Sequence, residues 1–434
     1  MRRSFKYQMR PTAKQSQALT AMLKDHCDLY NAALQERRDS YRHVSKTSTS
    51  YYDQSAQLSQ IRAQDAAHAV DGGVSRWSFS SQQATLRRLN KAFTAFFDRV
   101  KKGQTPGYPR FRSVHRFDAV EFPKNGDGCQ WAATPKTGTS TWTHVRLQGV
   151  GHVKVNIHRP WAGRVKTITV KREGTRAHPK WFVIISCDDV PEHPLPTTGL
   201  AVGIDLATGA NGLGWLATCD TTTGELDTPA ALLNVRAYKR LETKLAAAQQ
   251  QAAASKPNPG KRSSVRHKRD KDRVRAIHSK IARVRAGHLH KVSTMLVREY
   301  DVIVHENLNV KNMTKAPAPK PNPTPVDGRG DYLPNQAAAK AGLNKSILDS
   351  GWSTLIGMIN VKAECAGRSV IPINPAYTSQ ECHACGTTDA QARNGKVYSC
   401  TNPDCAWTGD ADQNAALNIL RAGLALTDSS QAAA

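Results

Sequence analysis

Two short pairs of cysteines constrain the fold of this chain more than any other feature of its sequence. Cys382 and Cys385 are separated by two residues, and Cys400 and Cys405 by four. The polar segment 393–396 lies between the pairs and is typical of a turn. Thiol pairs at this spacing favour a tetrahedral Cys₄ zinc site, which is a closed structural centre. The alternatives are two local disulfides or buried free thiols.

The rest of the cysteine pattern predicts a cytoplasmic protein. The other five cysteines are scattered along the chain, unlike a secreted disulfide framework. The first residues lack the apolar segment of a secretory signal, and no run of about 18 apolar residues is long enough to cross a membrane. We therefore expect the scattered cysteines to be small core residues.

The charge of the chain points to a polyanionic partner. The sequence has 61 Lys and Arg against 35 Asp and Glu, a formal net charge of +26. Nucleic acid is the first candidate, and an anionic membrane surface is the alternative. Residues 256–299 show a helical pattern with 14 Lys and Arg and three acids, which favours phosphate contact over a merely solvated face. The residues assigned to this contact are Arg266, Lys268, Arg269, Arg273, Arg275, Lys280, Arg283 and Arg285.

Apolar periodicity divides the chain into an α+β part followed by an α/β part. Residues 3–10 alternate as a strand, and further short strands between residues 117 and 187 predict a small β-barrel completed by that strand. The helical patterns between them are an insertion into the barrel. The proline-rich segment 191–199 predicts a linker, after which buried strands alternate with helices.

Three acids stand at equivalent places in the α/β part. Asp205 and Glu306 each end an apolar strand, and Asp412 opens the last helix. Ligand sites in α/β folds gather at the carboxyl ends of strands, and carboxylate oxygens suit Mg²⁺ or Mn²⁺. Two such ions can activate water and stabilise the leaving oxygen in phosphodiester hydrolysis. Each acid alone is more often a cap or an ion-pair partner, so the prediction of a nuclease depends on all three together.

Longer segments around these residues resemble the TnpB family, RNA-guided DNA endonucleases encoded by insertion sequences. The sequence is similar also to the miniature type V CRISPR effectors. The resemblance covers nearly the whole chain and is most specific between residues 374 and 420. The matching segments are 202–205, 304–313, 374–386 and 409–420, with 11–12, 30–31 and 108–111 in the N-terminal part.

The resemblance implies a multidomain α+β and α/β fold. An N-terminal wedge β-barrel would carry an inserted helical recognition lobe, and an RNase H-like RuvC nuclease domain would carry an inserted Cys₄ zinc module that binds target nucleic acid. The implied bounds are 1–10 and 111–190 for the barrel, 11–110 for the lobe, 191–199 for the linker, 200–375 and 409–424 for the nuclease, 376–408 for the zinc module and 425–434 for a disordered tail.

Carried over to this sequence, the resemblance makes Asp205, Glu306 and Asp412 the catalytic ligands of two Mg²⁺ (or Mn²⁺) ions. It makes Cys382, Cys385, Cys400 and Cys405 the ligands of one structural Zn²⁺. Within the acidic element, Asp412 is preferred to Asp410 because Asn414 follows it two residues later. The implied partners are a guide RNA and double-stranded DNA beside a short motif, with one protein per guide, no membrane partner, and association with the nucleoid through DNA.

Three polar residues at a helix start are candidates for reading that motif. Ser81, Gln82 and Gln83 could contact bases, because amides pair with adenine, but capping of the helix is an equally open interpretation. The chain also departs from the family pattern in three places. Residues 206–209 stand where Leu-Gly commonly follows the first acid, Ala411 stands where an arginine is frequent, and the second cysteine pair has four intervening residues. None of these departures removes an acid.

Several alternatives remain beside an active transposon nuclease. A miniature type V CRISPR effector with the same chemistry and a nuclease-dead RNA-guided DNA-binding protein would share the fold. A sugar-kinase-like ATPase is suggested by the glycines after Asp205, but it would leave the cysteines and the charge without a role. An HUH transposase is suggested by His288 and His290, whose side chains diverge on a helix.

Overall fold

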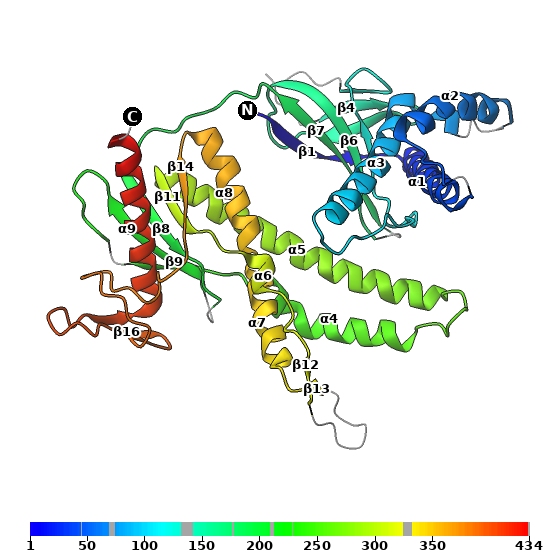
Figure 1. The fold of residues 1–434 in the computed structure, drawn as a ribbon. Helices are drawn as coiled ribbons and strands as arrows, with labels where there is room; N and C mark the ends of the chain where they lie inside the picture. The colour runs from blue at the N-terminus through cyan, green and yellow to red at the C-terminus, as the bar shows by residue number, and fades with distance from the viewer. Residues whose placement is uncertain are drawn as a thin grey trace. The chain divides into compact units, whose positions relative to one another are not determined.

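The computed structural model divides into two compact units, Met1–Pro191 and Glu192–Ala434 (Figure 1). It describes residues 1–44, 46–68, 74–131, 142–175, 178–208, 212–227, 229–323 and 332–432. The boundary falls where the expected linker begins. Backbone bonds from His193 N to Cys365 O (2.8 Å) and from Leu195 N to Ala366 O (3.0 Å) tie that segment to the second unit. No helix among the described residues is both long and apolar enough to span a bilayer.

The first unit contains a seven-stranded antiparallel sheet in the order β2-β6-β7-β1-β5-β4-β3. The strands are β1 (Arg3–Arg10), β2 (Ala119–Phe122), β3 (Cys129–Trp131), β4 (Trp142–Leu147), β5 (Gly151–Asn156), β6 (Arg164–Gly174) and β7 (Pro179–Asp188). The N-terminal strand lies between β5 and β7 and completes the sheet. Sequence alternation missed only β3, which is too short to show a period. Closure of the sheet into a barrel stays a prediction.

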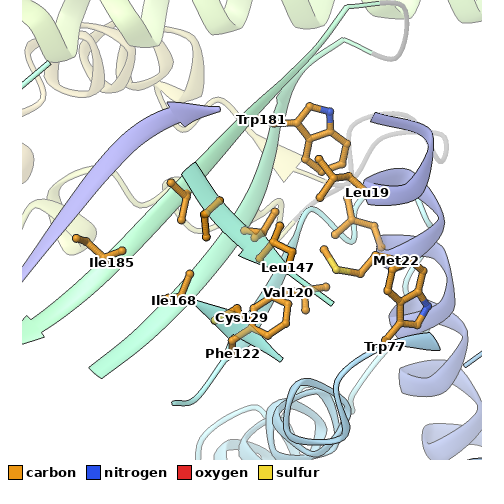
Figure 2. Close-up of a cluster of buried hydrophobic side chains, with 14 of the residues drawn as sticks. Leu19, Met22, Trp77, Val120, Phe122, Cys129, Leu147, Ile168, Trp181 and Ile185 are labelled. Carbon is orange, nitrogen blue, oxygen red and sulfur yellow. The ribbon is translucent and has the colours of Figure 1, made fainter. Parts of the chain in front are cut away.

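In the described part of the first unit, three α-helices and a 3₁₀ turn accompany this sheet, and the first and third of these helices pack on its strand β2. They are α1 (Ala13–Arg42), α2 (Tyr51–His68), the 3₁₀ turn η1 (Val74–Arg76) and α3 (Phe79–Lys101). A capping box, in which Thr12 and Gln15 bond each other's backbone N–H, begins α1. Leu19 and Met22 of this helix meet Trp77 and the inward side chains of the strands in one core (Figure 2).

The second unit contains a mixed five-stranded sheet in the order β10-β9-β8-β11-β14. The strands are β8 (Leu200–Asp205), β9 (Gly212–Asp220), β10 (Ala230–Leu233), β11 (Val302–Glu306) and β14 (Ser369–Ile373). The strands β8, β11 and β14 are parallel, whereas β9 and β10 are antiparallel to their neighbours. The carboxyl ends of β8 and β11 therefore meet at one edge of the sheet.

Helices cover both faces of this sheet. On one face lie α5 (Val265–Glu299) and α8 (Trp352–Ala366), and on the other lies α9 (Ala411–Ala432). The last helix approaches the strands very closely, because a Cβ at Gly203 of β8 would lie 2.6 Å from the Ala416 carbonyl oxygen. A Cβ at Gly423 would likewise lie 2.3 Å from the Val304 side chain. Glycine at both positions lets α9 lie directly on the sheet.

Some elements differ from the sequence predictions. The apolar pattern of residues 346–365 predicts one amphipathic helix. The structure has two helices there, α7 (Ala337–Ser350) and α8, which are separated by Gly351 at φ +73°. The last helix continues to Ala432, where a disordered tail was expected from residue 425. The helix α4 (Ala237–Ala254) was not predicted, although Tyr238, Leu241, Leu245 and Ala248 recur in it at helical spacing. It packs antiparallel to α5 through Leu245 and Ile281 (Figure 1).

Short elements complete the second unit. The loop between β11 and α7 contains the short helix α6 (Val310–Met313) and the paired strands β12 (Lys320–Pro321) and β13 (Tyr332–Leu333). This loop is rich in proline, and its Pro325 lies outside the described residues. The first cysteine pair precedes a three-stranded antiparallel sheet of β15 (Arg393–Asn394), β16 (Val397–Ser399) and β17 (Thr408–Asp410), and the second pair lies in the loop between β16 and β17.

Candidate functional site

The two strand-end acids leave neighbouring parallel strands at the same edge. Ile204 of β8 pairs with His305 of β11, so Asp205 and Glu306 are the next residues of their strands. Asp412 lies in the first turn of α9, which packs on β8. All three side chains are half-buried. The fold thus gathers at one edge of the sheet three acids that are up to two hundred residues apart in sequence.

The electrostatics show that Glu306 and Asp412 act on Asp205. Burial raises the pKa of Asp205 to about 7, and the negative charges of Glu306 and Asp412 contribute in the same direction. Burial also raises the pKa of Glu306. Ionisable groups perturbed by burial together with specific charged neighbours are typical of functional sites. The predicted acids therefore form one cluster of negative charge.

Two of the acids are held by side chains that sequence reasoning missed. Thr378 Oγ1 donates a hydrogen bond to Glu306 Oε1 at 2.7 Å, and Arg393 Nη2 donates to Asp412 Oδ1 at 2.8 Å. Both residues belong to the segment between β14 and α9. A single Thr or Arg in a loop carries no pattern, so no signal in the sequence distinguished them. The carboxylate oxygens of the three acids are not all as close together as the sulfur atoms of the paired cysteines. Among the described residues, these cysteines are the only group of metal-ligating side chains whose donor atoms all lie within 4.8 Å of one another.

The neighbouring acid Asp410 has a different role. Its Oδ1 accepts hydrogen bonds from the backbone N–H groups of Asp412 (2.8 Å) and Gln413 (3.2 Å). This is the arrangement of an N-cap, which satisfies the first free donors of a helix. Asp410 therefore fixes the start of α9, and Asp412 is the acid that pairs with Arg393.

The four paired cysteines form a compact cluster. Cys382 Sγ lies 3.9 Å from Cys405 Sγ, and Cys385 Sγ lies 3.6 Å from Cys400 Sγ. All four sulfur atoms are within 4.8 Å of one another, and all are free thiols rather than disulfides. A tetrahedron with Zn–S bonds of about 2.3 Å places its sulfur atoms about 3.8 Å apart. The four cysteines could therefore hold a zinc ion.

Two buried asparagines attach the first cysteine pair to α9. Asn414 Oδ1 accepts from His383 N at 2.9 Å, and its Nδ2 donates to Glu381 O at 2.7 Å. Asn418 Nδ2 donates to the same Glu381 oxygen at 2.6 Å and to Thr378 O at 3.0 Å. The side chains of α9 thus connect the cysteine cluster to the acid edge, two residues from Asp412.

Most of the cations predicted to contact phosphate are exposed on α5. Arg275 and Arg285 are exceptions, because Arg275 pairs with Asp272 at 2.6 Å and Arg285 Nη1 donates to Leu348 O at 2.9 Å. Both are half-buried and support the fold. The exposed members of the set are Arg266, Lys268, Arg269, Arg273, Lys280 and Arg283. They leave a basic solvent-facing surface on this helix.

The candidate motif-reading residues of α3 are engaged within the protein. Ser81 and Gln82 are buried, with Ser81 Oγ 2.9 Å from His26 Nε2 and Gln82 Oε1 accepting from Arg62 Nη1 at 2.5 Å. Gln83 is half-buried, and its Nε2 donates a hydrogen bond to Ser55 Oγ on α2 at 3.0 Å. The first turn of α3 packs into the core and its N-cap is Ser78, so Ser81 and Gln82 are neither capping residues nor exposed base-contacting residues.

Three family models match separate parts of the chain. A model described as "Helix-turn-helix domain" matches residues 1–46, one described as "Probable transposase" matches residues 184–316, and one described as "Cas12f1-like, TNB domain" matches residues 352–419. The first match contains β1 and α1 in this structure. The third includes the four cysteines and Asp412.

Related proteins match over most of their length. A protein of Streptomyces pristinaespiralis is 29% identical over 434 residues, covering 98% of this chain and 90% of the relative. InsQ of Escherichia coli K12 is 29% identical over 345 residues, covering 79% and 74%. Both are provisionally named RNA-guided DNA endonucleases. A solved structure titled as a Cas12f1–sgRNA–target DNA complex has a TM-score of 0.50 at 12% identity, covering 94% and 83%, so this mixed α/β multidomain fold is similar to it.

Proposed function

Because this chain belongs to the TnpB family, we propose that it is an RNA-guided DNA endonuclease. In this proposal a bound guide RNA recognises double-stranded DNA beside a short motif, and the protein cuts that DNA. The observation that carries the proposal is the convergence of Asp205, Glu306 and Asp412 at one sheet edge. A miniature CRISPR effector would use the same chemistry, and the DNA that neighbours the gene distinguishes the two origins.

The three carboxylates would hold two Mg²⁺ or Mn²⁺ ions. The donor set fits such ions, because all of its members offer hard oxygen atoms and because burial, together with the negative charges of Glu306 and Asp412, raises the pKa of Asp205. When bound, the ions activate water and stabilise the leaving oxygen in phosphodiester hydrolysis. A nuclease-dead DNA-binding protein is the less favoured alternative, since none of the three acids has been lost.

The chain's own residues position this site. The hydroxyl of Thr378 holds one oxygen of Glu306, and the cap formed by Asp410 fixes the turn that carries Asp412. Asn414 and Asn418 hold α9 against the cysteine loop. The mixed sheet with acids at its edge supports an RNase H-like RuvC domain, into which residues 376–408 insert as a zinc-bearing module.

The remaining parts would hold the nucleic acids. In the proposal, the first unit is the wedge barrel with its helical lobe, and exposed cations of α5 contact backbone phosphates. Base pairing with the guide supplies sequence specificity, and the protein reads the shape and backbone of the heteroduplex. One protein would bind one guide in the cytoplasm, where its DNA target lies.

Purification with the DNA that flanks the gene tests the proposal. RNA should copurify, and a plasmid library with randomised flanks should be cut in the presence of Mg²⁺. The variants Asp205→Ala, Glu306→Ala and Asp412→Ala should retain the RNA but leave the plasmid intact. The exposed acid Glu225 of the same unit supplies a matched control, since Glu225→Ala should cut normally. Absence of copurifying RNA would refute the central claim.

Metal analysis tests the cysteine cluster separately. The purified chain should contain one zinc, and Cys382→Ser should lower that content. The same substitution should lower the unfolding temperature, because a structural zinc contributes directly to folding. A full complement of zinc in the Cys382→Ser protein would contradict the assignment.

A further inference from the structure

A cleft in the first unit lies outside every site described so far. It encloses about 450 Å³ and is lined by Leu34, Arg38, Tyr41 and Arg42 of α1 and by Tyr108, Pro109, Arg110 and Phe111 of the loop before β2. The volume falls in the range of about 300–1,000 Å³ that is usual for small-ligand pockets. The four residues of α1 follow helical spacing and share one face.

The walls of the cleft are aromatic and exposed. Tyr41 is 66% exposed, Tyr108 is 44% exposed and Phe111 is 47% exposed. Large exposed aromatic side chains gathered around one cavity are typical of a binding site rather than of a core. The bottom of the cleft is closed by Leu34, which is buried.

The cleft is already formed in the free protein. The ring of Tyr108 packs edge-on against Phe93 (centroids 5.6 Å apart) and Phe96 (5.4 Å), which fixes its orientation. Just beyond the cleft, Asn31 brackets the backbone of Arg112, accepting from its N–H and donating to its carbonyl oxygen, both at 2.8 Å. The loop is therefore anchored on α1 at one end and on α3 at the other.

The charge of the cleft is positive. Arg38, Arg42 and Arg110 line it without any acidic neighbour in the lining. Within the described part of the chain, no ion pair joins these three guanidinium groups to a carboxylate. Unpaired arginines beside exposed aromatic rings suit a ligand with a flat π-face and a phosphate group.

We propose that this cleft binds one unpaired nucleotide of the bound RNA, with its base stacked on the aromatic wall and its phosphates on the arginines. The inference depends on the proposed function for the presence of an RNA. Unpaired bases in RNA loops and ends expose faces that stack on aromatic and arginine side chains. The bases of duplex DNA are stacked and have no free face for such contact.

Binding measurements on the intact protein, stripped of RNA and titrated with its copurifying RNA, test the cleft. Tyr41→Ala should weaken RNA binding about tenfold, because stacking of one base on one aromatic ring has that order of effect. Its salt dependence should be unchanged. Arg42→Ala should weaken binding and lower the slope of log K against log salt by about 0.7, the value for one phosphate contact in a single strand.

Matched controls come from the same unit. Tyr52 on α2 is 79% exposed and lies outside the cleft, so Tyr52→Ala should bind RNA as the unchanged protein does. Lys14 is an exposed cation on the same helix as Arg42, and Lys14→Ala should leave the salt slope unchanged. Tyr41 and Arg42 are exposed, so equal unfolding temperatures exclude a folding defect.

Ultraviolet cross-linking identifies the ligand in place. In the copurified complex, a cross-linked nucleotide on a peptide that contains Tyr41 or Tyr108 supports the proposal. Unchanged RNA affinity in both Tyr41→Ala and Arg42→Ala would overturn it while leaving the proposed function intact. A loss of target-DNA binding with unchanged RNA affinity would also overturn it, because the cleft would then hold DNA. Failure of any RNA to copurify would overturn the proposed function, and the cleft proposal with it.

Discussion

The two units each bury an ionisable group, and the two groups are satisfied to different degrees. His26 of α1 is fully buried, and its ring nitrogens lie 2.8 Å from Met22 O and 2.9 Å from Ser81 Oγ. Asp205 in the second unit lies among acids of the same charge. Burial lowers the pKa of His26 to about 4 and raises that of Asp205 to about 7. A buried polar group with two partners stabilises a fold, whereas buried like charges destabilise it and are typical of function.

The largest effect expected from this difference is on cleavage. Asp205→Asn should lower the single-turnover cleavage rate about 10³-fold or more, because loss of a metal-ligating carboxylate removes several kcal/mol of transition-state stabilisation. The unfolding temperature in EDTA should be unchanged or higher, since one negative charge leaves the cluster. A clearly lower unfolding temperature in EDTA would show that Asp205 is a structural residue like His26.

The same comparison explains what the sequence could predict. Asp205, Glu306 and Asp412 were predictable because strand ends and family motifs mark them locally, and the cysteines because their spacing alone specifies a site. The roles of Arg393 and Thr378 could not be predicted from the sequence, because their contacts depend on how the segment before α9 packs on the sheet.

Neither interpretation that the sequence left open for Gln82, base contact or capping, describes its burial, and the apolar stripe of α3 explains that burial. Gln82 lies four residues before Leu86, seven before Leu89 and eleven before Phe93, so all four share one helical face. That face is the buried one. Extending the apolar stripe toward the start of the helix would have predicted burial of Gln82. The amide pattern alone could not, because it carries no information on which face meets the core.

A second prediction concerns His26, the buried group whose two ring nitrogens both have partners. The folded pKa of His26 is about 4, below the ordinary value of 6.5, so the unfolded chain takes up a proton first as pH falls. Its contribution to stability is complete above pH 6.5 and is lost between pH 6.5 and 4, by about 3 kcal/mol. Urea unfolding at pH 7.5, 6 and 5 measures this loss.

The matched variant for that measurement is His26→Gln. It keeps a polar side chain in the core but has no group that titrates in this range, so its stability should fall less between pH 7.5 and 5. Equal pH dependence in both proteins would mean that His26 is not the group responsible.

A smaller effect is expected where the acid edge meets the cysteine loop. Arg393 lies 2.8 Å from Asp412 and places a positive charge where a metal ion would bind. Arg393→Ala should therefore tighten Mn²⁺ binding by up to about fivefold, since half-exposed ion pairs are worth about 1 kcal/mol at most. Calorimetric titration of the RNA-free protein with Mn²⁺ measures the change. Lys396→Ala, in the same turn, is the control, and weaker Mn²⁺ binding by Arg393→Ala would contradict the prediction.

A similarly small effect should come from the hydrogen bond that holds Glu306. Thr378→Val keeps the shape of the side chain but removes the hydroxyl that donates to Glu306 at 2.7 Å. The cleavage rate should fall about fivefold, because a hydrogen bond of this kind contributes about 1 kcal/mol. Thr378→Ser retains the donor and should cut at nearly the original rate. If Val and Ser behave alike, the hydroxyl does not position the acid, and metal binding alone must orient Glu306, as it would have to orient Asp205.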